Sequence, residues 1–244
     1  MRKIIASMAA SAAVLLGGQA LAADMPYIPD IPEVDYDIGG SFYLRGSGGL
    51  NWHYAKEVNH PDLPATWETV EYGYGYSVGA GFGYETGTGL RFDATIDQVE
   101  TTGLKITKEG MTPSSANGDY TLMLRSTVAL ANVYYDFSFG SNGFGYSGAG
   151  TFGYVGAGAG VAWNHAEVNA PTAAPVQTGT NVSAAAAVMA GVGYDMGSWV
   201  ADIGYRGLYI NQINNSPTTD DNQYYEIDNN FIHEVRGTVR YRFD

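Results

Sequence analysis

The stretch Phe231–Phe243, FIHEVRGTVRYRF, decides the fold of this chain. In an extended strand, successive side chains point to opposite faces. One face then carries Phe231, Val235 and Tyr241, while the other carries Glu234 and three arginines. A soluble sheet would bury the apolar face and wet the charged one, whereas a strand of this length that ends on aromatics also fits a barrel closed in lipid. In lipid the last strand must pair with the first, because no water satisfies an open edge.

The amino-terminal residues indicate export. Arg2 and Lys3 precede an apolar run, Ile4–Leu16, and Ala20–Ala22 has the small-x-small pattern of a cleavage site. A membrane anchor needs ~20 apolar residues, more than this run supplies. We therefore predict three segments: a signal peptide over residues 1–22 that is cleaved near Ala22, an acidic, proline-rich periplasmic lead-in over 23–40, and a barrel over 41–244.

Composition narrows the class of protein. The chain has a net charge of −13, and removal of the signal peptide takes away two basic residues and no acidic one, which leaves −15. Nucleic acid is therefore excluded as a partner. An exported chain without cysteine cannot use disulfides for stability. No long apolar run follows residue 22, so a membrane-spanning chain of this kind must be a barrel.

Alternation of apolar and polar residues predicts eight strands. The sixth stretch has an alanine run that is also compatible with a helix, but its closing AGVGYD and the turn after it favour a strand. The two halves of the fourth do not keep one register, so we expect a bulge near Thr127. The predicted strands span residues 41–52, 72–84, 90–97, 120–137, 154–163, 182–194, 199–209 and 231–243. The side chains expected to face lipid include Phe42, Tyr74, Tyr76, Phe92, Tyr205 and Tyr241.

The connections between these strands alternate in length. Tight turns are expected at 85–88 and 195–198, and an intermediate glycine-rich one at 138–151. Long, polar connections are expected at 53–71, 101–119, 164–181 and 211–226. Long loops at one rim and short turns at the other are typical of transmembrane barrels.

The positions of the cations predict what fills the barrel. In the mature chain every arginine lies in a predicted strand, and every lysine (Lys56, Lys105, Lys108) lies in a long connection. Arginine suits enclosed pairing with carboxylates, whereas lysine suits water. Except for Arg125, the arginines share the face opposite the aromatics, and bare glycine faces on the second and fifth strands give them room. The predicted lumen charge network is Arg45, Arg91, Asp93, Asp97, Asp202, Arg206, Glu234, Arg236, Arg240 and Arg242, with Asp136 as a further candidate.

The chain resembles a known family, the small eight-stranded outer-membrane β-barrels of Gram-negative bacteria. This family includes the OmpA-like and opacity-like surface antigens often labelled porin-family proteins. The resemblance lies in ALANVYYDF (129–137), YVGAGAG (154–160), AGVGYD (190–195), DIGYR (202–206) and HEVRGTVRYRF (233–243). It implies location in the outer membrane of a bacterial cell. It also implies an assembly signal, read by the barrel-assembly machinery, at Val239, Tyr241 and Phe243. The chain departs from the family's pattern by placing Asp244 after the final phenylalanine.

Nothing in the sequence indicates an enzyme. There is no cysteine, and His53, His60, His165 and His233 have neither a nucleophile elbow nor zinc-ligand spacing around them. We therefore predict no catalytic, cofactor or metal site. Some relatives in the resembled family are described as haemin-binding surface proteins, so haemin binding remains a lesser alternative that only loop histidines and tyrosines support.

The function predicted is structural and surface-interacting. Eight strands enclose an interior that side chains can fill, whereas open pores use about 16, so we expect a charge-plugged lumen that conducts poorly. The loops 53–71 and 211–226 combine carboxylates with Trp67, Tyr224 and Tyr225, a mixture suited to contact with a host or surface ligand. Outer-membrane lipid and lipopolysaccharide are the other expected partners. The alternatives are a small general porin and a soluble lipocalin-like ligand carrier.

Overall fold

The computed structural model describes residues 39–54, 57–59, 68–108, 118–139, 150–169, 177–214 and 226–243. The predicted signal peptide and almost all of the predicted lead-in lie outside the described residues. Eight long strands and two short ones are present. The strands are β1 (Ser41–Tyr54), β2 (Glu57–Asn59), β3 (Glu68–Glu71), β4 (Gly73–Glu85), β5 (Leu90–Lys108), β6 (Gly118–Ser138), β7 (Gly150–Asn169), β8 (Gln177–Asp195), β9 (Trp199–Asn214) and β10 (Glu226–Phe243).

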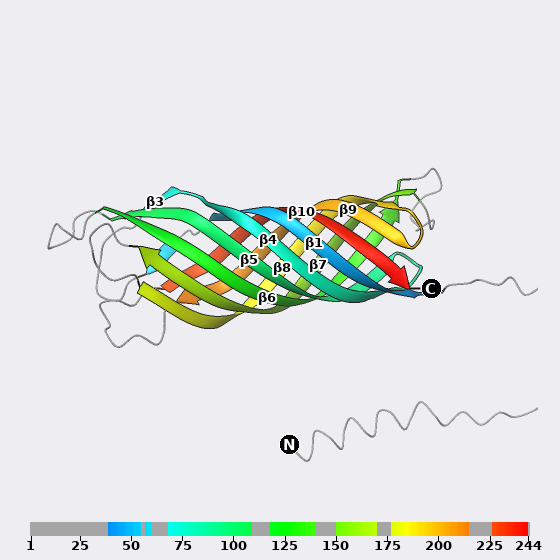
Figure 1. Ribbon diagram of the computed structural model, residues 1–244, viewed down its shortest axis with the longest axis horizontal. Coiled ribbons are helices and arrows are strands. Elements are labelled where there is room, and N and C mark those ends of the chain that lie inside the picture. Colours follow the sequence, from blue (N-terminus) through cyan, green and yellow to red (C-terminus); the bar gives the residue numbers. More distant parts are fainter. Residues whose placement is uncertain are drawn as a thin grey trace, which may run out of the picture. The chain divides into compact units, whose positions relative to one another are not determined.

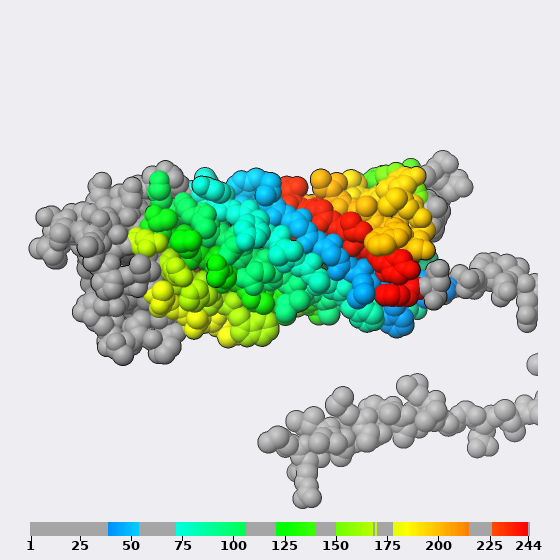
Figure 2. Space-filling model, viewed as in Figure 1, coloured from blue at the N-terminus to red at the C-terminus, as the bar shows by residue number. Residues whose placement is uncertain are grey.

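The eight long strands form one closed antiparallel ring. Each pairs with the next in the order β1-β4-β5-β6-β7-β8-β9-β10, and β10 pairs with β1 from Phe42↔Phe243 to Tyr54↔Phe231. The first and last strands therefore lie side by side (Figures 1 and 2). Closure leaves none of the long strands with an open edge, which is the condition for a sheet surrounded by lipid. The predicted fold class, an eight-stranded antiparallel up-and-down barrel, is confirmed.

The strands are longer than predicted at the end of the barrel that carries the long connections. The structure continues β5 to Lys108, β7 to Asn169 and β9 to Asn214, so parts of the predicted loops are strand. Lys105 and Lys108 consequently lie in β5, and the prediction that every lysine lies in a loop is wrong. The predicted loop 53–71 also contains β2, which pairs with β10, and β3, which pairs with β5.

The bulge expected near Thr127 is absent from the structure. The pairing of β6 with β7 runs without a shift from Thr121 to Ser138. The irregularity lies instead in β5, between Thr101 and Leu104, where Gly103 adopts φ +79°. The two halves of β6 looked out of register because the apolar residues move from one face of the strand to the other, not because the backbone shifts.

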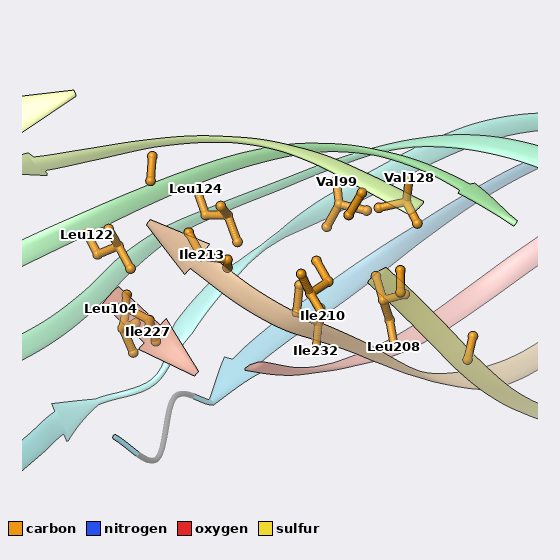
Figure 3. Packing of buried hydrophobic residues seen from close by; sticks show 14 of the residues in the cluster. Val99, Leu104, Leu122, Leu124, Val128, Leu208, Ile210, Ile213, Ile227 and Ile232 are labelled. Atoms are coloured by element: carbon orange, nitrogen blue, oxygen red, sulfur yellow. The ribbon is translucent and has the colours of Figure 1, made fainter. Parts of the chain in front are cut away.

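The interior of the barrel has two layers. We call the first the apolar layer. Its inward side chains pack against one another at the end with the long connections (Figure 3). It comprises Val99, Leu104, Leu122, Leu124, Val128, Leu130, Ala162, Ala166, Ala185, Ala187, Leu208, Ile210, Ile213, Ile227 and Ile232. The second, the ionic layer, lies toward the short turns and comprises Arg45, Glu85, Arg91, Asp93, Asp97, Asp136, Asp195, Asp202, Arg206, Glu234, Arg236, Arg240 and Arg242. The layers are directly adjacent along the strands: the inward-facing residue that follows Asp97 on β5 is Val99, and the one that follows Arg206 on β9 is Leu208.

The outer face carries an apolar band. All six aromatic side chains predicted to point outward are exposed, from 39% for Tyr241 to 65% for Tyr74. Aromatic residues lie near both edges of the band, such as Trp52 and Trp163 toward the long connections and Trp199 toward the short turns. Beyond the band, toward the long connections, the outward residues of β5, β6 and β9 become polar while many of their inward ones become apolar, as at Arg125 and Leu124 on β6. The alternation of these three strands is therefore inverted between the two ends of the barrel, whereas β1 and β4 keep residues such as Trp52 and Tyr74 outward.

Candidate functional site

Glycines make the charged interior possible. The inward face of β4 carries glycines at alternate positions, and a Cβ at Gly79 would overlap the Asp97 carboxylate. A Cβ at Gly83 would meet the Tyr43 ring and Asp93, and one at Gly158 on β7 would meet the Asn132 amide. The bare glycine faces therefore provide the space into which the charged side chains of neighbouring strands extend, as the sequence predicts.

The first cluster of the ionic layer adjoins the apolar layer. Arg206 on β9 reaches Asp97 on β5, with Nη1 2.7 Å from Oδ2, and its Nε donates to Glu234 on β10. Arg236 donates to the other Asp97 oxygen at 2.5 Å and lies 3.7 Å from Glu234. Two arginines and two carboxylates thus connect β9 and β10 with β5, which lies on the other side of the ring. Arg206 is only 1% exposed, so this cluster is fully enclosed.

The second cluster centres on Asp93. Its carboxylate accepts hydrogen bonds from Arg45 Nη1 at 2.8 Å, Tyr43 Oη at 3.0 Å and Asn132 Nδ2 at 2.7 Å. Arg45 also donates to Tyr134 Oη at 2.8 Å. A buried carboxylate that accepts several bonds is well compensated for the loss of water. Sequence reasoning named Arg45 and Asp93 but missed the tyrosine and asparagine donors, although they have the same inward parity.

Arg91 and Asp136 form the most regular pair of the layer. The two guanidinium donors Nε and Nη2 lie 2.7 and 2.9 Å from the two carboxylate oxygens, a bidentate geometry. The guanidinium also lies over the Tyr134 ring, 4.3 Å from its centroid, and 5.6 Å from that of Tyr154. Stacking on aromatic faces adds to the stabilisation of a desolvated cation. The structure therefore gives Asp136, only a further candidate in the sequence, a defined partner.

The third cluster lies at the short turns. Arg242 pairs with Asp195 at 2.6 Å and with Glu85, and Arg240 lies 3.2 Å from Glu85 and 3.8 Å from Asp202. Sequence reasoning missed Glu85 and Asp195 because both stand at strand ends, which it assigned to turns. Their parity could have identified them, since each continues the inward face of its strand. Asp202 accepts a hydrogen bond from Tyr154 at 3.1 Å and does not pair with Arg206.

Packing leaves little free space between these clusters. A cavity of about 20 Å³ lies among Arg45, Arg91, Arg206, Arg236 and Asp202. That volume is enough for about one water molecule. Within the described interior, some buried nitrogens have no hydrogen-bond partner in the protein, including Arg206 Nη2 and Arg236 Nε. Isolated waters, and not a continuous column, fit this arrangement.

His53, expected in a loop, is instead buried inside the barrel at the end of β1, with Nε2 3.2 Å from Asn230 Oδ1. Other residues singled out in the sequence lie on the outside. Val239, Tyr241 and Phe243 are exposed on the outer face of β10, beside the short turns. Arg125 points outward and pairs with Glu100, with Nη2 2.5 Å from Oε1. His233 is also outward, with Nδ1 2.6 Å from Tyr205 Oη.

The part of the chain that the structure describes contains no group of three or more His, Cys, Asp or Glu side chains that could hold a metal ion. Among the same residues, no helix is long and apolar enough to cross a membrane.

This combination of a closed eight-stranded ring, an apolar outer band and an interior filled by side chains is the fold of the small outer-membrane barrels. The solved structures include one with a TM-score of 0.50, Neisserial surface protein A, which is 20% identical over 84% of this chain and 99% of that one.

A more distant similarity is to Ail, the attachment invasion locus protein of Yersinia pestis, solved with the heparin analogue sucrose octasulfate; the TM-score is 0.40, with 13% identity over 83% of this chain and 99% of that one. Another is to the outer-membrane protease OmpT of Escherichia coli, with a TM-score of 0.27 and 9% identity over 84% of this chain and 96% of that one. No protein-family model and no curated protein matches the sequence.

Proposed function

We propose that the protein is an integral outer-membrane barrel with a structural and surface-interacting role, whose lumen is closed. The observation that carries this proposal is the pairing of an apolar outer band with an enclosed ionic layer inside the same strands. A soluble carrier would require the opposite arrangement, with an apolar ligand cavity inside and polar residues over the whole outer face. Similarity in fold to Neisserial surface protein A agrees with the proposal.

The filled interior argues against the porin alternative. An open channel needs a water-lined path, but the ionic layer crosses the lumen through Asp97, Arg206 and Arg236, and the apolar layer follows it. A narrow apolar constriction is itself a barrier to ions because water leaves it readily. We therefore assign the surface role to the rim that carries the long connections, with the loops 53–71 and 211–226 as the proposed contact regions.

Spin labels test the membrane position of the barrel. A nitroxide at Tyr76, which is 52% exposed, should be accessible to oxygen in lipid, whereas one at Ser77, which is 3% exposed, should be shielded from lipid. A matched pair beyond the band extends the test: a label at Arg125 should be accessible to water, and one at Leu124 should be shielded from both water and lipid. Equal access to water at Tyr76 and Ser77 would overturn the proposal.

Surface exposure and loop function need separate measurements in cells. Protease added to intact cells should cleave within 60–67 or 215–225, the parts of the two loops outside the described strands, while the strands remain protected. Deletion of 60–67 and 215–225 should reduce adhesion, host recognition or envelope integrity and leave heat-modifiable migration of the barrel on gels unchanged. If the double deletion changes none of these three properties, the proposed interaction role is wrong and only the structural role remains.

A further inference from the structure

We propose that the outer wall of the barrel carries a binding site for the phosphate of an outer-leaflet lipid headgroup, formed around Arg125 and His165. The inference rests on the proposed outer-membrane location and adds a specific ligand class and position to it. Arg125 is the only arginine of the described residues that points outward, and its side chain is 63% exposed. The six other described arginines all belong to the ionic layer, so this one requires a different explanation.

Three successive outward rows across β5, β6, β7 and β8 place Arg125 at the level of lipid headgroups. The first row, Ile96–Ala129–Val161–Ala184, is apolar; the second, Gln98–Thr127–Trp163–Val182, is mixed; the third, Glu100–Arg125–His165–Thr180, is polar. A change from aliphatic residues through tryptophan to charge is the order found across a membrane interface. The part of this row at Arg125 and His165 therefore lies where phosphates and sugars of the outer leaflet would lie, whereas Tyr76, which pairs with Glu100 at the other end, still belongs to the apolar band.

The surface at this level is hollowed. One hollow of about 360 Å³ is lined by Arg125, Thr127, Trp163, His165 and Thr180 among others. A second of about 150 Å³ shares Arg125 and His165 and extends to Met123. Arginine donates in a planar fork that matches phosphate, while hydroxyl and imidazole groups supply further hydrogen bonds. The first hollow is thus suited to an anionic headgroup that enters from the side of the membrane.

Neighbouring groups hold the guanidinium in place. Arg125 Nε and Nη2 both contact Glu100 Oε1, at 2.7 and 2.5 Å. Glu100 also accepts a hydrogen bond from the Tyr76 hydroxyl. His165 Nε2 lies 3.3 Å from Glu167 Oε1. Glu100, which pairs with Arg125, lines the smaller hollow but not the larger one. The Arg125 guanidinium is therefore the charged group that lines the larger hollow.

The opposite side of the barrel provides a comparison. Past the apolar band on β9 and β10, the outward groups are Asn211 and Asn229, and Tyr209 Oη donates to both, at 3.2 and 2.8 Å. These neutral groups satisfy one another and offer no cation. The proposed site is therefore confined to the wall formed by β5 to β8.

Native mass spectrometry of the refolded full barrel in lipid discs tests the site. The probe is bis-phosphorylated lipid A, and the reference is the same lipid after dephosphorylation. We expect the wild type to retain the phosphorylated form about tenfold better, the size of one charge-assisted hydrogen-bonded contact. Arg125→Gln should abolish the preference, Arg125→Lys should keep part of it, and the control Asn211→Ala should leave it unchanged.

Each other outcome overturns the inference. Equal retention of the two lipids by the wild type, or an unchanged preference in Arg125→Gln, would show that no phosphate site exists on this wall. Complete displacement of the lipid by inorganic phosphate would show a simple anion site and not a lipid site. Insertion into the discs and heat-modifiable migration are recorded for every variant, so a barrel that inserts without preference refutes this inference alone, and one that never inserts refutes the proposed function.

Discussion

The ionic layer and the apolar layer lie inside the same strands but hold them together by different means. In the ionic layer, charged side chains cross the lumen, as Arg206 does to reach Asp97, and the strands outside them present apolar residues. In the apolar layer, side chains such as Leu124 pack against one another, and the outer face changes from apolar residues such as Val161, beside Ala162, to polar residues such as Arg125, beside Leu124. The ionic layer thus lies behind the apolar band, whereas the apolar layer extends from behind the band to the part of the wall that would face water.

The two layers should respond differently to loss of a side chain. Burial of an ion pair is weakly stabilising at best, but removal of one partner leaves an uncompensated charge. Burial of apolar groups is stabilising in proportion to the area removed from water. The ionic layer should therefore show strong coupling between its members, and the apolar layer should show the graded costs of an ordinary core.

The largest effect is expected in the ionic layer. Arg206→Ala should lower the free energy of unfolding by about 3–5 kcal/mol, the scale for breaking a buried ion pair, because Asp97 and Glu234 would keep their charges with only Arg236 between them. Urea unfolding of the barrel in lipid measures this. The double variant Arg206→Ala with Glu234→Gln should lose less than the sum of the two single variants. Additive losses would show that the pair is not coupled.

A smaller and separate effect is expected in the apolar layer. Leu124→Ala should cost about 2–5 kcal/mol, the range for truncating a buried leucine, because Leu124 is 2% exposed. Combined with Arg206→Ala, its cost should add to within about 0.5 kcal/mol if the layers are energetically independent. The outward Leu44, which is 50% exposed, is the matched control: its change to alanine in lipid discs should cost about 1–2 kcal/mol, the lost transfer from water to lipid, without a cavity cost because lipid fills the space. A coupling of several kcal/mol between the layers would contradict their separation.

The smallest effect is expected for the arginine outside the wall. Arg125→Ala should change the free energy of unfolding by no more than about 1 kcal/mol, as for exposed ion pairs, even though Arg125 contacts Glu100 as closely as Arg206 contacts Asp97. The loss of free energy of unfolding on changing an arginine to alanine would then differ several-fold between Arg206, inside the barrel, and Arg125, outside it. A loss as large as that of Arg206→Ala, measured under the same conditions, would remove the distinction between enclosed and exposed pairs.

The sequence predicted the ring of strands because alternation is a strong signal wherever one face is apolar. It also placed Arg45, Arg91, Arg206, Arg236, Arg240 and Arg242 on the inward face, because their parity is opposite to that of the aromatics. It failed where the apolar face changes sides. The predicted ends at Asp97, Trp163 and Tyr209 stand near this inversion, beyond which a continuous strand has the pattern of a polar loop.

The pairing within the ionic layer could not be predicted. Sequence parity shows that Arg206 and Asp97 both point inward, but which carboxylate an arginine reaches across the lumen depends on the stagger of strands that are not neighbours. In the structure Arg206 pairs with Glu234 on the neighbouring strand and with Asp97 across the lumen, while Asp202 is left to Arg240 and Tyr154. The apolar layer was missed for two reasons: some members, such as Leu104 and Ile213, were assigned to loops, and others, such as Leu122 and Leu124, lie in the half of β6 whose register was unsettled.

Electrical recording across a planar bilayer tests the closed lumen most directly. Refolded wild-type barrel, inserted and shown to be folded by its heat-modifiable migration, should give no steady conductance above that of the bare bilayer, because the cavity among the ionic clusters has space for about one water and the apolar layer excludes ions. Arg125→Ala should be equally silent. Large, stable and continuous conductance in the wild type would contradict the account and make the porin alternative the correct one.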